Sequence, residues 1–365
     1  MKQSNGKIGM KEYIAIVVFM IGAKIADDTP SLFFKQLDNA AWMSPLINGL
    51  AAILPIALFI KVLTLYKGMN LAEITCRLLG NFIGKIVLFF LWAILFSAIV
   101  LDSSVYSEII TSTYFPNSST FLVLTVLIGV CAYIGKKGIE QIGSVSWALF
   151  PYVETFFVLA LALCMLQGNF DFLFPFFGPS EWTVIKNSVT KGSVFADFTF
   201  ILLIAPAVKN MKDLKKGTWI SFGIILVEAA IALASYVLLF DYHSVKMMSY
   251  PFHESIFYVE FGFLTNVEIL IFPFWLVGAF IRFAAYLYLS AILLGNILGI
   301  KNFEYIIPVL AALTLLCGMI LPITPDILNQ LRELELLAAT PVFFLYPVLL
   351  FVIAKWRGEK RVSSD

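Results

Sequence analysis

Charged residues are scarce in this sequence of 365 residues. Asp, Glu, Lys and Arg together make up 13% of the chain, whereas hydrophobic residues make up 60%. A soluble globular chain has about 25% charged and about 45–50% apolar residues, so the composition excludes an ordinary water-soluble enzyme. The 25 basic and 24 acidic residues nearly cancel, which leaves a nucleic-acid partner without electrostatic support. The mean hydropathy of +0.91 instead predicts an all-α polytopic membrane protein.

Residues that build metal sites and covalent active sites are also few. The four cysteines are widely spaced without a C-x-x-C pair, and we interpret them as single buried hydrophobes. Two histidines, His243 and His253, share one loop, and with no cysteine nearby they do not supply a zinc site. The sequence has no glycine-rich phosphate loop, no H-E-x-x-H motif and no nucleophile elbow. We therefore expect no metal, no cofactor and no enzymatic activity.

Long apolar runs dominate instead. A membrane-spanning helix needs about 20 mostly apolar residues, and the runs predict ten such helices in one transmembrane domain, residues 1–365. The first run is no cleavable signal peptide, because it lacks a small-residue cleavage site. The predicted spans cover approximately residues 12–33, 42–65, 84–113, 119–135, 144–167, 184–206, 218–241, 267–294, 304–321 and 338–354.

Basic residues are distributed unevenly between the loops. If the N-terminus is inside, most Lys and Arg residues fall on the cytoplasmic side. The outer side then keeps Lys35, Lys186, Lys246 and Arg332, with Lys191 close by. Because basic loops stay in the cytoplasm, this bias predicts that both termini are cytoplasmic and that the loop at 242–266 is external.

Two of the predicted spans contain helix-breaking and charged residues at membrane depth. The first span contains GAKIADDTP at residues 22–30. Proline removes a backbone donor, and freed backbone groups are tolerated at this depth only against protein or a watery cavity. We therefore predict two half-helices around a non-helical stretch at residues 23–29. The sixth span is interrupted similarly by Gly192, Asp197 and Pro206, and paired interruptions of this kind point to a transporter binding site.

Arg282 lies close to the middle of the predicted eighth span. A charge at the bilayer centre costs about 2.5–3.5 kcal/mol on insertion scales, so Arg282 needs a partner. Its candidate partners are Asp27, Asp28, Asp102 and Asp197. Two interpretations stay open. The arginine forms an ion pair that fixes helix packing, or its guanidinium holds the carboxylate of a ligand.

Further polar residues accompany Arg282. Tyr286 lies one helical turn beyond Arg282, and Tyr106 has the same spacing from Asp102, so each pair shares a helix face. Glu154 and Glu228 also lie within spans, and for these we favour a structural role. The candidate ligand-binding residues are Gly22, Ala23, Lys24, Asp27, Asp28, Asp102, Tyr106, Asp197, Arg282 and Tyr286.

Taken in order, these motifs resemble the spore-germination permease family, the B subunits of nutrient germinant receptors, which belongs to the amino acid–polyamine–organocation superfamily. The resemblance rests on a short basic N-terminus, ten spans and the break GAKIADDTP. It also rests on NAAWMSPLINGL before the second span, IAPAVKNMKDLKK after the sixth, and VEILIFPFWLVGAFIRFAAYLY in the eighth. Family members usually have an uncharged break, so Lys24, Asp27 and Asp28 depart from the pattern.

The resemblance implies two inverted five-helix repeats, approximately residues 12–167 and 184–354, around a central site. It further implies a subunit in the spore inner membrane or cell membrane that binds a small, amino-acid-like nutrient and triggers germination. Its implied partners are an A-type membrane subunit, a C-type lipoprotein and the lipid bilayer. Two other functions remain open: an active amino acid or organic-cation permease, which intramembrane carboxylates favour, and a scaffold for other membrane proteins.

Overall fold

The computed structural model describes residues 6–190, 192–262, 266–321 and 324–357. Its regular elements are helices, and the one β feature within these ranges is a parallel bridge between Ile8 and Val208. The α-helices are α1 (Met10–Ile21), α2 (Thr29–Leu37), α3 (Ser44–Leu65), α4 (Leu71–Leu79), α5 (Asn81–Ile109), α6 (Thr120–Lys136), α7 (Ile139–Gln167), α8 (Glu181–Thr190), α9 (Phe198–Ile201), α10 (Met211–Met247), α11 (Pro251–Tyr258), α12 (Val267–Leu298), α13 (Ile307–Ile320) and α14 (Pro325–Trp356).

Seven helical segments of the described chain are long and apolar enough to cross a membrane. They are Thr29–Leu65, Asn81–Tyr114, Ile139–Gln167, Met211–Met247, Val267–Leu298, Phe303–Ile320 and Ile327–Trp356. Of the other predicted spans, α6 has 17 residues, and the first and sixth are interrupted. The fold is therefore an all-α membrane fold, as predicted, while the count of ten spans stays a prediction.

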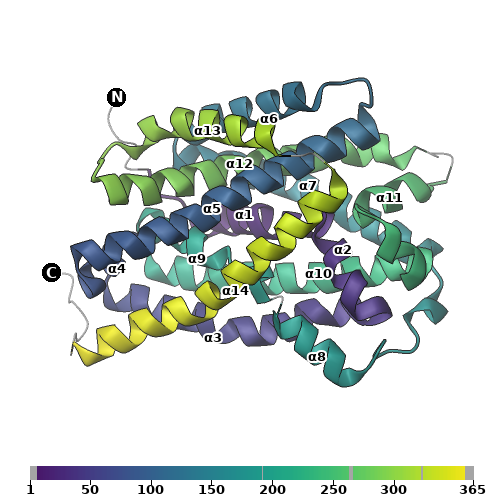
Figure 1. Cartoon of the computed structure of the whole chain (residues 1–365), viewed down its shortest axis with the longest axis horizontal. Coiled ribbons are helices and arrows are strands. Elements are labelled where there is room, and N and C mark those ends of the chain that lie inside the picture. The colour runs from purple at the N-terminus through teal and green to yellow at the C-terminus, as the bar shows by residue number, and fades with distance from the viewer. Residues whose placement is uncertain (1–5, 191, 263–265, 322–323, 358–365) are drawn as a thin grey trace.

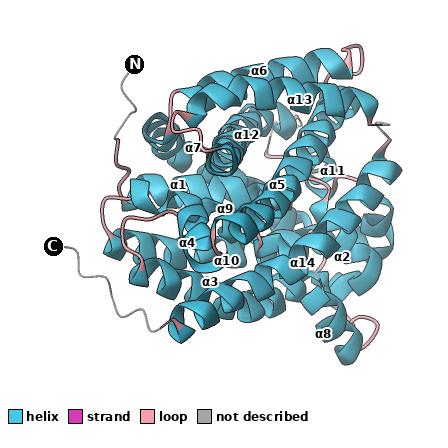
Figure 2. Cartoon of the chain, turned by 60° about the vertical axis from the view of Figure 1, so that its left-hand side comes forward, coloured by secondary structure: helices cyan, strands magenta, loops and turns pink. Residues whose placement is uncertain are grey.

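The first helix occupies the interior of the bundle. Every residue from Tyr13 to Ile21 is buried, and α1 packs against α7, α10 and α12. Figures 1 and 2 both show α1 enclosed by other helices, with α14 lying across α3 and α5. The outer helices instead expose large apolar side chains such as Phe82 and Leu166, as expected for surfaces solvated by lipid.

The helix break in the first span lies where the sequence predicted it. After α1 ends, a 3-10 turn, η1 (Gly22–Ala26), is followed by Asp27 with φ −109° and ψ −148°, and α2 begins at Thr29. The prediction of a non-helical stretch at 23–29 is wrong for residues 23–26, which keep 3-10 hydrogen bonding, and for Thr29, with which α2 begins. Pro30 is tolerated in the first turn of α2, because a first-turn residue needs no backbone donor.

The sixth predicted span is also interrupted. It consists of α8, a 3-10 turn η5 (Gly192–Phe195), the four-residue helix α9, and a second 3-10 segment, η6 (Leu202–Ala207). Asp197 lies between η5 and α9. Lys191 and the chain ends, residues 1–5 and 358–365, lie outside the described residues, so their predicted placement stays a prediction.

The N-terminal segment is tied to the end of this interrupted span. The amide of Ile8 donates to the carbonyl of Ala207 at 2.9 Å, and the amide of Lys209 donates to the carbonyl of Ile8 at 3.0 Å. Both segments lie on the side that the basic residues predict to be cytoplasmic. The start of the first span and the end of the sixth are thereby held together.

The predicted orientation is tested by cysteine labelling. Met247, at the end of α10, is 89% exposed, and Lys212, at its start, is also exposed. In a chain without its four natural cysteines, a membrane-impermeant thiol reagent should label Met247→Cys in intact cells. Lys212→Cys should be labelled only after permeabilisation. The reverse pattern would show that the orientation is inverted.

Candidate functional site

The side chain of Asp27 shapes the break between α1 and α2. Its Oδ1 accepts a hydrogen bond from the amide of Thr29 at 2.8 Å and so satisfies one of the free amides at the start of α2. The carbonyl of Asp28 accepts from the hydroxyl of Ser31 at 2.8 Å. Asp27 thus holds the break in place while its second oxygen, Oδ2, faces Arg282 at 3.1 Å.

Arg282 of α12 is fully buried and meets two aspartates. Besides the contact with Asp27, its Nη1 donates to the hydroxyl of Tyr106 at 3.1 Å, and its Nη2 pairs with Oδ2 of Asp102. The guanidinium carbon also lies 5.5 Å from the ring centres of both Tyr106 and Tyr286, within cation–π range. Arg282 therefore pairs with two of its four candidate partners, Asp27 and Asp102.

A second buried arginine, Arg332 of α14, joins the same aspartates. Its Nη2 lies 3.2 Å from Oδ1 of Asp28, and its Nη1 pairs with Oδ1 of Asp102 and lies 3.1 Å from Glu335. The prediction that Arg332 lies in an outer loop is wrong, because α14 begins at Pro325 and carries the arginine into the bundle, where it is 1% exposed. The available signal was an arginine and a glutamate at i,i+3, which share one face of a helix.

A third ion pair connects the two interrupted spans. The ammonium of Lys24, in η1, lies 2.7 Å from Oδ2 of Asp197, and the hydroxyl of Tyr286 donates to the same oxygen at 2.7 Å. The side chains of Lys24 and Asp197 are 5% and 6% exposed. The two breaks are therefore joined by one charged contact, and Tyr286 extends it towards Arg282.

These contacts form one buried group, which we call the charged network. Eight of the ten candidate residues belong to it, and Arg332 and Glu335 are additions that the sequence analysis missed. Its members are Lys24, Asp27, Asp28, Asp102, Tyr106, Asp197, Arg282, Tyr286, Arg332 and Glu335. Such a network is costly to desolvate, and it is stable only while each charge keeps its partners.

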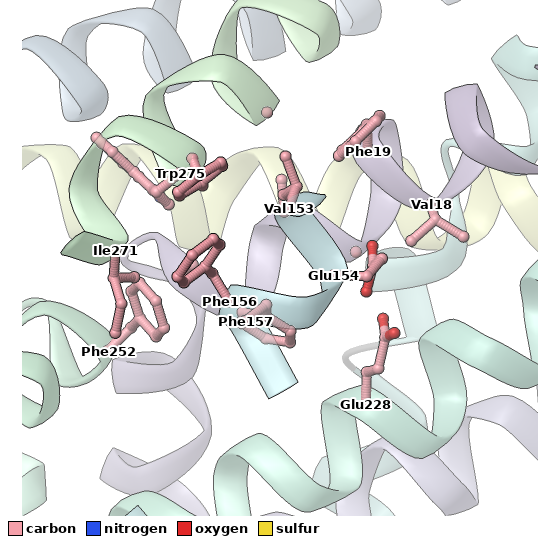
Figure 3. A pocket seen from close by; sticks show the side chains of 15 residues that line it. Val18, Phe19, Val153, Glu154, Phe156, Phe157, Glu228, Phe252, Ile271 and Trp275 are labelled. Carbon is pink, nitrogen blue, oxygen red and sulfur yellow. The ribbon is translucent and has the colours of Figure 1, made fainter. Parts of the chain in front are cut away.

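The other two candidates, Gly22 and Ala23, line a cavity of about 60 Å³ beside the break. Figure 3 shows that its walls are largely aromatic and aliphatic side chains from α1, α7, α11 and α12. Two carboxyl groups, those of Glu154 and Glu228, face each other at its edge. The cavity therefore differs chemically from the charged network, although both border η1.

Side chains also satisfy the backbone carbonyls that the break leaves free. Such carbonyls have no helical partner and need another donor. The donors are the hydroxyls of Tyr106 and Tyr236 and Nε2 of His253, which reach the carbonyls of Ala23, Ile25 and Ala26 at 3.4, 3.2 and 3.1 Å respectively.

His253 joins helix α11 to this break. Because a carbonyl only accepts, Nε2 must carry the proton that reaches Ala26. In the neutral ring Nδ1 is then an acceptor, and it receives the hydroxyl of Tyr114 at 2.8 Å. Burial lowers the pKa of His253 from its ordinary 6.5 to about 3. The sequence alone does not predict this role of His253, since nothing in its loop indicates that α11 is buried.

The sequence and the fold both have known relatives. A family model described as "Spore germination protein" matches residues 9–327. The chain is 21% identical to spore germination protein KB of Bacillus subtilis (strain 168) over 361 residues, 96% of this chain and 95% of that protein. It is 23% identical to spore germination protein GerQB of Bacillus cereus over 283 residues, 76% of each chain.

Among solved structures, MhsT in complex with L-phenylalanine matches with a TM-score of 0.65 at 12% identity. The match covers 95% of this chain and 89% of that one. At this identity the likeness shows the fold alone, which is the LeuT-type transporter fold with inverted repeats and broken helices. The repeat boundaries near 12–167 and 184–354 stay a prediction.

Neutralising Arg282 tests the buried ion pairs. Arg282→Met should lower the free energy of unfolding by about 3–5 kcal/mol, because it leaves the buried carboxylate of Asp27 with Arg332 alone, at 4.0 Å. Adding Asp27→Asn should recover part of this loss, since Asp102 keeps Arg332 and the amide oxygen of an asparagine can still accept from the amide of Thr29. Thermal unfolding of the purified protein in nanodiscs measures both effects.

The matched control is the half-exposed pair between Lys246 and Asp38, whose Nζ–Oδ1 distance is 2.5 Å. Lys246→Met should change the free energy of unfolding by at most about 1 kcal/mol, because solvent screens the pair. Equal effects of Lys246→Met and Arg282→Met would contradict the view that the buried pairs hold the break in place.

The lowered pKa of His253 predicts acid sensitivity. The folded protein disfavours the charged ring, so its stability is complete above pH 6.5 and falls as the pH drops below that value. The slope should be about 1.4 kcal/mol per pH unit for one such histidine. His253→Gln should abolish this contribution, whereas His243→Gln, at a side chain 75% exposed, should leave it intact. Unfolding curves over an acid pH series give the comparison, and an unchanged slope in His253→Gln would assign the acid sensitivity to other groups.

Proposed function

The chain belongs to the spore germination protein family, and we propose that it is the B-type subunit of a nutrient germinant receptor. In this proposal it binds a small, amino-acid-like nutrient in the spore inner membrane. Binding is passed on to an A-type membrane subunit and a C-type lipoprotein. The similarity to spore germination protein KB along nearly the whole chain supports this assignment, as does the transporter fold.

The observation that carries the proposal is the pair of Lys24 and Asp197 across the two helix breaks. An amino acid carries the same two charges, an ammonium and a carboxylate. It can therefore replace the internal pair charge for charge, with its carboxylate on Lys24 and its ammonium on Asp197. An exchange of this kind leaves no buried charge unpaired, which is the costly outcome in such a site.

A ligand that replaces the contact between Lys24 and Asp197 can also change the conformation of the protein. The contact between Lys24 and Asp197 ties η1 to the segment between η5 and α9. A ligand placed between the two side chains changes the relative position of the two breaks. A ligand shifts a conformational equilibrium only through different contacts in the two states, and this exchange provides that difference.

The second candidate function is an active permease for amino acids or organic cations. The likeness to the MhsT fold and the buried carboxylates of the charged network favour it. The two functions differ in whether solute crosses the membrane. Tracer uptake into proteoliposomes separates them, because a receptor binds the nutrient without accumulating it. A neighbouring pair of genes for an A-type subunit and a lipoprotein would also favour the receptor.

Ligand binding is tested with a panel of amino acids and the protein in nanodiscs. The double variant Lys24→Met/Asp197→Asn removes both charges together, so it should stay folded and lose at least about tenfold in affinity, or about 1.4 kcal/mol. The control Lys246→Met/Asp38→Asn removes an ion pair elsewhere and should bind as the unmodified chain does. Undiminished binding by the first double variant would rule out this site.

A further inference from the structure

Two glutamates form a pair outside the charged network. Glu154 lies near the middle of α7 and Glu228 near the middle of α10, and both helices are long enough to cross the membrane. Figure 3 shows their carboxyl groups pointing towards each other at the edge of the cavity. The two carboxyl groups face each other closely enough to share a hydrogen bond.

The surroundings of this pair supply no compensating charge. The remaining described residues that line the cavity are aliphatic, aromatic or glycine, among them Phe19 of α1, Phe157 of α7, Phe252 of α11 and Trp275 of α12. None of them titrates. The pair therefore lies among groups that cannot neutralise a carboxylate.

Nearby titratable groups on the adjoining elements are engaged elsewhere. In η1, Lys24 pairs with Asp197, and Asp27, which follows η1, pairs with Arg282. In α11, His253 is bonded to the carbonyl of Ala26 and the hydroxyl of Tyr114. The charge balance of the two glutamates thus depends on the pair itself.

A bound proton can neutralise part of the negative charge of the two glutamates. An ionised carboxylate only accepts hydrogen bonds, so a hydrogen bond between two carboxyl groups needs a proton on one of them. Two ionised carboxylates sharing one site repel each other strongly. Near the bilayer centre an unpaired charge is costly in addition. One proton held between the two groups removes the repulsion and half of the charge.

We propose that Glu154 and Glu228 form a proton-binding site beside the break of α1, separate from the charged network, in which the two carboxyl groups share one proton. The site reaches the break directly, since a Cβ built on Gly22 would lie 3.7 Å from Oε2 of Glu228. The cavity has room for water, through which the proton can leave. Loss of the shared proton leaves two negative charges between α7 and α10. Protonation therefore controls how closely these helices pack beside η1.

Infrared difference spectroscopy of the protein in nanodiscs tests the proposal directly. At neutral pH the unmodified chain should show the carbonyl stretch of a protonated carboxylic acid, which shifts on exchange into heavy water. The band should be lost in Glu154→Gln/Glu228→Gln. It should be retained in the control Glu254→Gln, which changes an exposed glutamate of α11. A band that persists in the double variant, or one absent from the unmodified chain, overturns the proposal.

Thermal unfolding provides a second measurement. Raising the pH from neutral to strongly alkaline should lower the melting temperature of the unmodified chain, because the shared proton is lost. Glu228→Gln should show a smaller decrease, since the amide donates a hydrogen bond to Glu154 without a proton from solvent. An equal decrease in both proteins overturns the proposal. So does stabilisation of the unmodified chain by ammonium or alkali ions at fixed pH, because a cation would then hold the pair.

Discussion

Asp102 is the residue on which the buried charges of this protein depend, because two arginines from different helices bind its two carboxylate oxygens. Arg282 comes from α12 and Arg332 from α14, and each guanidinium then reaches an aspartate of the break, Asp27 or Asp28. Without Asp102, both arginines would lose a partner where an uncompensated charge is strongly destabilising. One carboxylate of α5 therefore sets the position of the break relative to α12 and α14.

The break itself is closed by the protein's own groups. In transporters with this fold, unwound carbonyls and half-helix ends hold the substrate and its coupling ions. Here the carbonyls of Ala23, Ile25 and Ala26 accept from side chains, and Lys24 and Asp197 neutralise each other. A ligand must therefore exchange for existing contacts rather than fill free ones. This requirement is selective, because a molecule that supplies only one of the two charges would leave the other buried and unpaired.

The sequence predicted the all-α fold, both helix breaks and the pairing of Arg282, because each depends on a local or one-dimensional signal. A long apolar run predicts a membrane span, and proline and glycine within it predict a helix break. A charged residue at membrane depth predicts a partner of opposite charge. The roles of Arg332 and His253 depend instead on packing between distant segments. Arg332 was placed in a loop because the start of α14 is polar, and its burial follows only from the approach of α14 to α5. The same limit applies to His253, whose helix α11 packs onto the break.

The charged network and the pair of Glu154 and Glu228 both border the five-residue turn η1. In the charged network each acid contacts a basic side chain, and Arg282 and Arg332 are each shared by more than one carboxylate, so the arrangement responds to molecules that carry charges of their own. The pair of Glu154 and Glu228 has no basic partner among its described neighbours, so it responds to the proton concentration. Because Gly22 borders this pair and Lys24 belongs to the network, a movement of η1 alters both at once. Ligand binding and protonation must then influence each other in both directions, since coupling between two sites on one element is reciprocal.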